Sequence, residues 1–135
     1  MKYLGIDYGT KRIGLALSDI EGRMAFPHAI IPAGKTAVTD LATLCTKEGV
    51  GMIIVGDSRD LMNGENPVMK KIRPFAEELR VATGLPLAFM NEVFSSREAT
   101  HMRGDDKDND ASAAAIVLQS YLDMDGVRNA KHQDE

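Results

Sequence analysis

Four acidic residues stand where predicted strands or helices meet loops: Asp7, Asp57, Glu92 and Asp110. The first ends a predicted strand, the next two follow two later strands, and the fourth opens the last predicted helix. In an open α/β sheet, ligand sites form at strand ends, where neighbouring loops converge. Carboxylates gathered at such an edge repel one another unless a cation neutralises them. The pattern therefore predicts a site for divalent metal ions.

Phosphodiester hydrolysis is the chemistry that such a site suits. Mg²⁺ takes oxygen ligands and keeps several waters, so two or three carboxylates are enough to hold it. Two ions about 4 Å apart can activate a water and stabilise the leaving oxygen of a phosphodiester. We predict Mg²⁺ or Mn²⁺ as cofactor, as two ions, with all four acids as ligands.

Each acid also has an ordinary structural interpretation. Asp7 precedes Tyr8-Gly9-Thr10, and Asp is common in turns. Asp110 precedes a helix, and Asp is a favoured N-cap. The other two acids could be solvated loop residues, which is the usual fate of carboxylates. The metal prediction thus depends on the four acids taken together.

Basic residues near these acids predict a local phosphate-binding rim. They are Lys11, Arg12, Arg59 and Arg97. The alternative is a solubilising surface, because exposed charges contribute little elsewhere. The formal net charge of −4 argues against a generic basic nucleic-acid binder. It leaves room for a nuclease, since bound metal ions add positive charge that the count omits.

Hydrophobic periodicity predicts an α/β protein with helices on both faces of its sheet. The predicted order is β-β-β-α-β-α-β-α. We expect strands at 2–7, 12–18, 23–32, 52–56 and 86–90, helices at 36–48, 67–82 and 110–123 with a short one near 95, and loops at 57–66 and 104–109. Pro27 predicts an edge position or a bulge. Pro74 predicts a helix kink.

The 135 residues fit a single domain, predicted at 1–125, followed by a polar, frayed tail at 126–135. A lone cysteine, Cys45, allows no internal disulfide. No stretch resembles a signal peptide, and no apolar run is long enough to cross a bilayer. We therefore expect a cytoplasmic protein without a membrane partner.

The segment from Gly5 to Asp19, GIDYGTKRIGLALSD, closely resembles the opening motif of the YqgF/RuvX family. These are RNase H-like proteins described as Holliday junction resolvases and as nucleases that process the precursor of small-subunit ribosomal RNA. Three further blocks resemble the family in the same order along nearly the whole chain: Ile54-Val55-Gly56 with Met62-Asn63-Gly64, Asn91-Glu92 with Ser95-Ser96 and Ala99, and Asp110 with Ala113-Ala114-Ala115, Leu118-Gln119 and Tyr121-Leu122.

The resemblance implies an RNase H-like fold with a five-stranded mixed sheet. It also implies a metal-dependent endonuclease that matures the 5′ end of precursor 16S rRNA, resolves Holliday junctions, or does both. Carried over by position, Asp7, Glu92 and Asp110 would be the catalytic acids. An in-line attack by an activated water would follow, with Lys11 or Arg12 holding the backbone.

The chain departs from the family pattern in three respects. Gly56-Asp57-Ser58 replaces the usual Gly-Leu-Pro and adds an acid where related RuvC-type resolvases place a metal ligand. Asn91 replaces an acid and Val93 replaces an arginine. The first departure enriches the predicted site, whereas the other two remove an acid and a base from it.

Two other functions remain open from the sequence. A non-catalytic module that binds RNA or a ribosome assembly factor is slightly favoured by Val93. The turn Asp7-Tyr8-Gly9-Thr10 also resembles the phosphate-binding turn of sugar kinases, although the chain is short for their two lobes. The nuclease could act as a monomer or a homodimer, and two-fold substrates suit two-fold enzymes.

Overall fold

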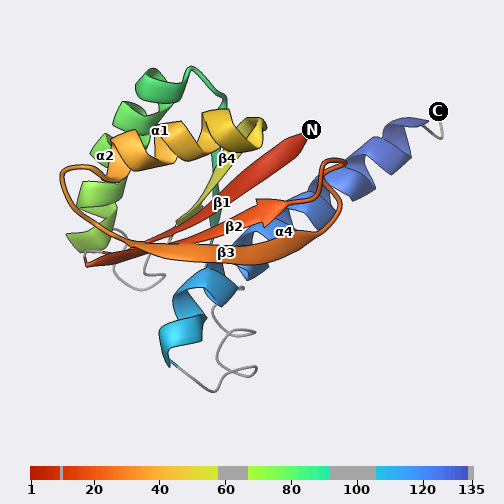
Figure 1. Cartoon of the computed structure of the whole chain (residues 1–135). Coiled ribbons are helices and arrows are strands. Elements are labelled where there is room, and N and C mark those ends of the chain that lie inside the picture. The colour runs from red at the N-terminus through yellow and green to blue at the C-terminus, as the bar shows by residue number, and fades with distance from the viewer. Residues whose placement is uncertain (10, 58–66, 92–105, 134–135) are drawn as a thin grey trace.

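A five-stranded mixed sheet forms the centre of the computed structural model, which describes residues 1–9, 11–57, 67–91 and 106–133 (Figure 1). Its strands lie in the order β3-β2-β1-β4-β5. They span β1 Lys2–Tyr8, β2 Arg12–Ser18, β3 Ala25–Pro32, β4 Val50–Asp57 and β5 Leu87–Asn91. β1 pairs antiparallel with β2 and β2 with β3, whereas β1, β4 and β5 run parallel. The predicted mixed sheet is thereby confirmed.

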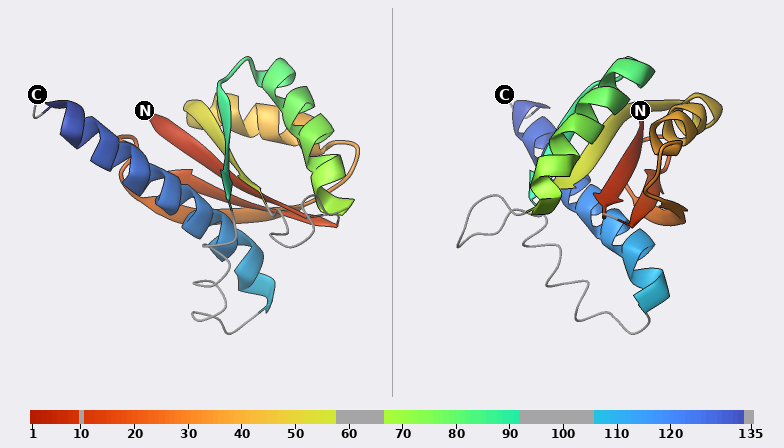
Figure 2. Two further views of the ribbon diagram at one scale, coloured as in Figure 1. Left: turned by 180° about the vertical axis from the view of Figure 1, so that it is seen from behind. Right: turned by 90° about the vertical axis from the view of Figure 1, so that its left-hand side faces the viewer.

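Helices cover the sheet on both faces. They are α1 Ala37–Glu48, α2 Pro67–Thr83 and α4 Asp106–Gln133. The first two lie together on one face, and α4 crosses the opposite face, where it touches all five strands (Figure 2). Each face therefore encloses its own apolar core.

The core under α1 and α2 is the larger one. Its fully buried members include Leu4, Ile6, Ile13, Ile53, Val55, Leu41, Ile72 and Leu79. The core under α4 comprises Ala16, Ile54, Ala114, Val117, Leu118 and Leu122. Neighbouring β4 residues enter opposite cores, which explains why this strand reads as a continuous apolar run.

Strand β3 lies at the edge of the sheet, as Pro27 predicts, because a proline cannot donate to a further strand. The pairing of β2 with β3 also shifts register between Leu15 and Ala16, opposite the segment from Pro27 to Ala29. Both features expected of this proline are thus present. Helix α2 continues on both sides of Pro74.

The last helix is longer than its apolar pattern predicts. It begins at Asp106, inside the segment expected to be a loop at 104–109, and continues to Gln133, through most of the expected frayed tail. Gly126 is the weakest helix former between Met124 and Gln133, and one glycine costs about 1 kcal/mol relative to alanine. A helix already anchored on the sheet tolerates that cost. The predicted loop at 57–66 and the short helix near 95 lie outside the described residues, apart from Asp57.

An ion pair joins the start of β1 to the end of α1, the helix that precedes β4. Lys2 Nζ lies 2.9 Å from Glu48 Oε1 at the end of α1, and both side chains are partly exposed. The hydrogen bond and charge of Lys2 lower the pKa of Glu48 below its usual value. Stability from this pair is present above the pKa of glutamate in the unfolded chain and is lost as the pH falls through the lowered value.

We therefore expect Glu48→Gln to flatten the acid limb of the stability profile. The change in urea midpoint between neutral pH and the carboxylate range should be smaller than in the wild type. Glu78→Gln on α2 serves as the control and should leave the profile unaltered. An unchanged acid limb in Glu48→Gln would mean that the pair contributes nothing to folding.

Candidate functional site

The carboxyl ends of β1, β4 and β5 meet at one edge of the sheet because the three strands are parallel. Asp57 is the last residue of β4 and pairs with Asn91, the last residue of β5. Ile6 of β1 pairs with Val55 of β4, so Asp7 lies one position beyond this pair and Asp57 two positions beyond it. The topology thus brings the predicted acids at positions 7 and 57 to adjacent strand ends.

Asp7 is partly buried and points to the face of the sheet that α4 covers. Its neighbour Ile6 is fully buried in the opposite core, and Tyr8 packs on Phe75 of α2 with ring centroids 4.7 Å apart. Side chains alternate along a strand, so Asp7 takes the face opposite to both. Gly5, two residues earlier on the same face, agrees with this orientation, because a Cβ atom placed on it would lie 2.7 Å from Leu118 Cβ of α4.

Helix α4 runs antiparallel to β1. The ring of Tyr3 lies 6.1 Å from that of Tyr121, and Gly5 adjoins both Leu118 and Ala114. Residue numbers therefore decrease along α4 in the direction in which they increase along β1. Four residues of a helix cover about the same length as two residues of a strand. We infer from this series that the part of α4 around position 110 approaches the end of β1 that carries Asp7.

Asp110 lies inside α4, four residues after its first residue. The expectation that it opens the helix is therefore wrong, and so is the capping interpretation attached to it. The reason is that the charged segment before it, expected to be a loop, joins the helix from Asp106 onward.

Some predicted residues lie outside what the structure describes. These are Glu92, Arg59 and Arg97, together with the side chains of Asp57 and Asp110. Among the side chains that it does describe, no three from His, Cys, Asp and Glu gather closely enough to hold a metal ion. Of the four predicted ligands, only Asp7 belongs to that described set.

Two predicted basic residues stand beside the end of β1. Lys11 and Arg12 are exposed, and Arg12 begins β2. Asp7 pairs with Gly14, so Arg12 lies two residues from this partner and shares its face of the sheet. Arg12 is thus exposed on the α4 face, from which a large anionic ligand such as a phosphate backbone would approach, and Lys11 is exposed next to it in the chain.

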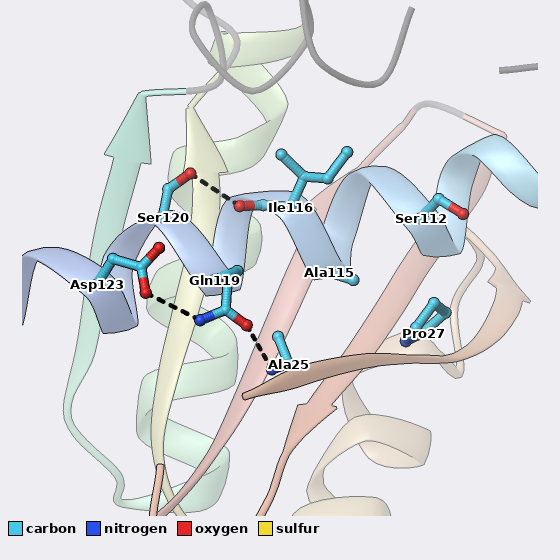
Figure 3. Close-up of a pocket in the computed structure, with 8 residues that line it drawn as sticks. All are labelled: Ala25, Pro27, Ser112, Ala115, Ile116, Gln119, Ser120 and Asp123. Carbon is cyan, nitrogen blue, oxygen red and sulfur yellow. Dashed lines mark hydrogen bonds between the residues drawn. The ribbon is translucent and has the colours of Figure 1, made fainter. Parts of the chain in front are cut away.

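A separate pocket of about 390 Å³ lies between the start of β3 and the outer side of α4 (Figure 3). It is lined by Ala25, Pro27, Ser112, Ala115, Ile116, Gln119, Ser120 and Asp123. This lining includes one acid but no base and no histidine or cysteine. Such a surface suits neither phosphate binding nor nucleophilic catalysis.

Gln119 is the side chain that ties this pocket together. Its Oε1 accepts a hydrogen bond of 2.8 Å from the backbone N–H of Ala25 (Figure 3). Its Nε2 donates to the carbonyl of Arg23 at 2.9 Å and to Asp123 Oδ1 at 3.0 Å. One amide therefore fastens the edge strand to the helix that carries Asp110.

We expect Gln119→Ala to lower the free energy of unfolding by about 1–2 kcal/mol, because two backbone groups lose their partner. Amide exchange at Ala25 should also accelerate. Ser120→Ala, which removes only a hydroxyl bonded to Ile116 O within the same helix, should cost less than about 0.5 kcal/mol. Equal urea midpoints for the two variants would contradict the fastening role.

Solved structures share this fold. The RuvC structure of Thermus thermophilus superposes with a TM-score of 0.63, at 14% identity, over 90% of this chain and 94% of that one. The fowlpox virus Holliday junction resolvase gives a TM-score of 0.57, at 15% identity, over 92% and 99% of the two chains. The chain thus has the RNase H-like α/β fold of RuvC-type resolvases.

Sequence comparison narrows this class. The model of the RuvX family, described as Holliday junction resolvase, matches residues 1–124. A relative from Anaeromyxobacter sp., provisionally named pre-16S rRNA nuclease, is 36% identical over 91% of this chain and 97% of its own length. A relative from Nitratidesulfovibrio vulgaris with the same provisional name is 34% identical over 92% and 94%. The chain belongs to the RuvX family, and this assignment decides against the sugar-kinase interpretation.

Sequence reasoning passed over two residues that shape the site. The sequence places Gln119 in a family block and Gly5 in the opening motif but predicts no separate role for either. A glycine in the middle of an apolar strand is a usable signal, because it often marks a place where another backbone approaches closely. Gln119 carries no comparable signal, since its two backbone partners, at Ala25 and Arg23, lie more than ninety positions away in the sequence.

Proposed function

We propose that this chain is an endonuclease that hydrolyses phosphodiesters in structured nucleic acid with Mg²⁺ or Mn²⁺. The observation that carries the proposal is the partly buried Asp7, which faces α4 where β1, β4 and β5 end together. Family membership supports the same activity. We expect it to act in the cytoplasm. None of the helices that the structure describes has the length and hydropathy that a membrane span requires.

We infer two candidate substrates from the names of similar proteins. Relatives bear the provisional name pre-16S rRNA nuclease, and one structural neighbour is RuvC in complex with a Holliday junction substrate. We propose the 5′ end of precursor 16S rRNA as the principal substrate and four-way DNA junctions as the second. A monomer would suit RNA processing, whereas symmetric cutting of a junction would require a homodimer.

The residues at this edge suit hard divalent cations. The donor set is made of carboxylate oxygens, which Mg²⁺ and Mn²⁺ prefer, and includes no thiolate or imidazole. We assign Asp7, Asp57, Glu92 and Asp110 as ligands, with Asp7, Glu92 and Asp110 as the catalytic set. Bound ions would supply an activated water and charge neutralisation at the leaving oxygen.

The protein's own contribution is placement. Asp7 is fixed in direction by the burial of Ile6 and by the packing of Tyr8 on Phe75. Lys11 and Arg12 would bind the phosphates that flank the scissile bond, and Arg59 and Arg97 would extend the same rim. Fixed ligands beside exposed cations would hold the substrate in register with the reacting phosphate.

The test is cleavage of precursor 16S rRNA and of a four-way DNA junction by the wild-type protein. Each substrate is incubated with Mg²⁺, with Mn²⁺ or with EDTA. We expect cleavage of the RNA with either metal and none with EDTA. Cleavage in EDTA would exclude a metal-dependent mechanism, and absence of cleavage of both substrates in either metal would reject the nuclease.

A second function is favoured by the departures at Asn91 and Val93. If loss of an acid and an arginine has silenced the site, the chain would bind RNA or a ribosome assembly factor without cutting. Gel-shift measurements of the same two substrates separate the possibilities. Tight binding of precursor RNA without product in either metal would select this second function.

A further inference from the structure

Gly5 lies in the middle of β1 between the buried residues Leu4 and Ile6. Glycine weakens a strand, because it has no side chain to pack. Gly5 is not among the residues with positive φ in the described chain, which are Gly22, Gly49 and Gly84. Backbone conformation therefore does not require glycine here, and the requirement must be one of space.

The space is occupied by α4. A Cβ atom placed on Gly5 would lie 2.7 Å from Leu118 Cβ and 3.0 Å from the backbone oxygen of Ala114. Neither atom can rotate away, since one is backbone and the other is fixed to it. A side chain at position 5 would therefore push the helix off the sheet, whereas the glycine lets the two backbones approach.

This contact is next to the proposed metal site on both elements. Asp7 is two residues further along β1, on the same face of the sheet as Gly5. Position 110 is one helical turn before Ala114, on the same side of α4. A displacement of the helix at Ala114 would thus be transmitted directly to the separation between positions 7 and 110.

We propose that Gly5 is a positioning residue that sets the spacing between Asp7 and Asp110 by admitting α4 to contact with β1. The inference rests on the proposed metal-dependent nuclease. Oxygen ligands must lie within about 2.0–2.1 Å of Mg²⁺, and the octahedral geometry tolerates little error. A helix shift of about 1 Å is enough to cost two orders of magnitude in a catalytic step.

The test compares Gly5→Ala with wild type by calorimetric titration of Mn²⁺ into the protein without nucleic acid. We expect the affinity for Mn²⁺ to fall by about 10- to 100-fold, as for the loss of other groups that orient ligands. In cleavage assays kcat should fall while KM stays unchanged, and raising the Mn²⁺ concentration should restore part of kcat. Urea midpoints measured without metal separate this result from a general loss of stability, which Mn²⁺ would also offset by binding the folded state.

Gly34→Ala is the matched control. No atom lies within 4 Å of a Cβ at Gly34, so this variant should bind Mn²⁺ as the wild type does. Ala16→Val is the second variant, for the case in which Gly5→Ala does not fold. Ala16 pairs with Gly5 from β2 and is buried against α4, so its enlargement should widen the same gap and weaken Mn²⁺ binding.

The outcomes separate the two proposals. If the wild type binds no Mn²⁺, or if Asp7→Asn binds it equally well, the metal site itself is wrong. If Asp7→Asn loses the metal but Gly5→Ala retains wild-type affinity, only the positioning role is wrong. Should Gly5→Ala fail to fold, wild-type Mn²⁺ affinity in Ala16→Val would overturn that role.

Discussion

Asp7→Asn should reduce cleavage of precursor 16S rRNA by at least about 100-fold, while binding of the RNA in EDTA stays close to that of the wild type. The lower limit follows from groups that merely orient metal ligands, whose loss costs about 10- to 100-fold, and a direct ligand should cost more. Asparagine keeps the size of the side chain but removes the charge. Single-turnover cleavage in Mg²⁺ and filter binding in EDTA measure the two quantities.

The same substitution should change the stability of the metal-free protein far less than it changes cleavage, because asparagine keeps the size and most of the hydrogen-bonding capacity of the side chain. Carboxylates that share an edge repel one another without a cation, and neutralising one of them relieves that repulsion. A loss of cleavage without a loss of stability would show that Asp7 acts as a metal ligand and not as a turn residue. Asp40→Asn is the control, because Asp40 is an exposed acid on α1, on the other face of the sheet.

Wild-type cleavage by Asp7→Asn would remove this carboxylate from the mechanism. A marked loss of stability in the variant would return Asp7 to its ordinary role as a turn residue, since its charge would then serve folding. Reduced cleavage by Asp40→Asn would mean that the assay reports net charge rather than the site.

Leu118→Ala should lower the free energy of unfolding by about 3 kcal/mol. Leu118 is fully buried in the core under α4 and contacts the strand at Gly5. Truncating a buried leucine removes its transfer free energy and leaves a cavity, for a usual total of about 2–5 kcal/mol. That is a large fraction of the 5–15 kcal/mol typical of a domain, so the urea midpoint should fall clearly.

Met124→Ala on the same helix is the matched control. Its side chain is 49% exposed, so its truncation should change stability by no more than about 0.5 kcal/mol. Because alanine is the better helix former at both positions, a comparable loss in both variants would show that burial of Leu118 against the sheet contributes no more to stability than the exposed contact of Met124. Mn²⁺ affinity should also fall in Leu118→Ala, because a loosened α4 holds Asp110 less firmly.

Much of the architecture follows from local patterns along the chain. The apolar run at 52–56 predicts a strand covered on both faces, and β4 does contribute to both cores. Pro27 predicts an edge strand because its missing N–H cannot join a ladder. These features depend on the residue and its immediate neighbours, so a sequence displays them directly. The resemblance of the GIDYGTKRIGLALSD segment to the opening motif of the YqgF/RuvX family predicts the family, and the comparisons confirm this prediction.

The limits of helix α4 could not be predicted in the same way. Its apolar stripe begins at Ala111, and the charged residues before it resemble a loop. They join the helix because each residue added to an anchored helix gains one backbone hydrogen bond. This gain depends on the neighbouring helix and not on the type of the added residue. The error mattered for Asp110, since it changed a supposed capping residue into one within the helix.

The sequence alone determined which acids this protein offers, Asp7, Asp57, Glu92 and Asp110, and that several stand at strand ends. The tertiary structure decided that three of those strands are parallel, so that their ends coincide, and that α4 lies against Gly5. Strand direction and helix approach are set by contacts between residues far apart in the chain. Such contacts have no local signature, and the space that a missing Cβ leaves is visible only when the opposing backbone is in place.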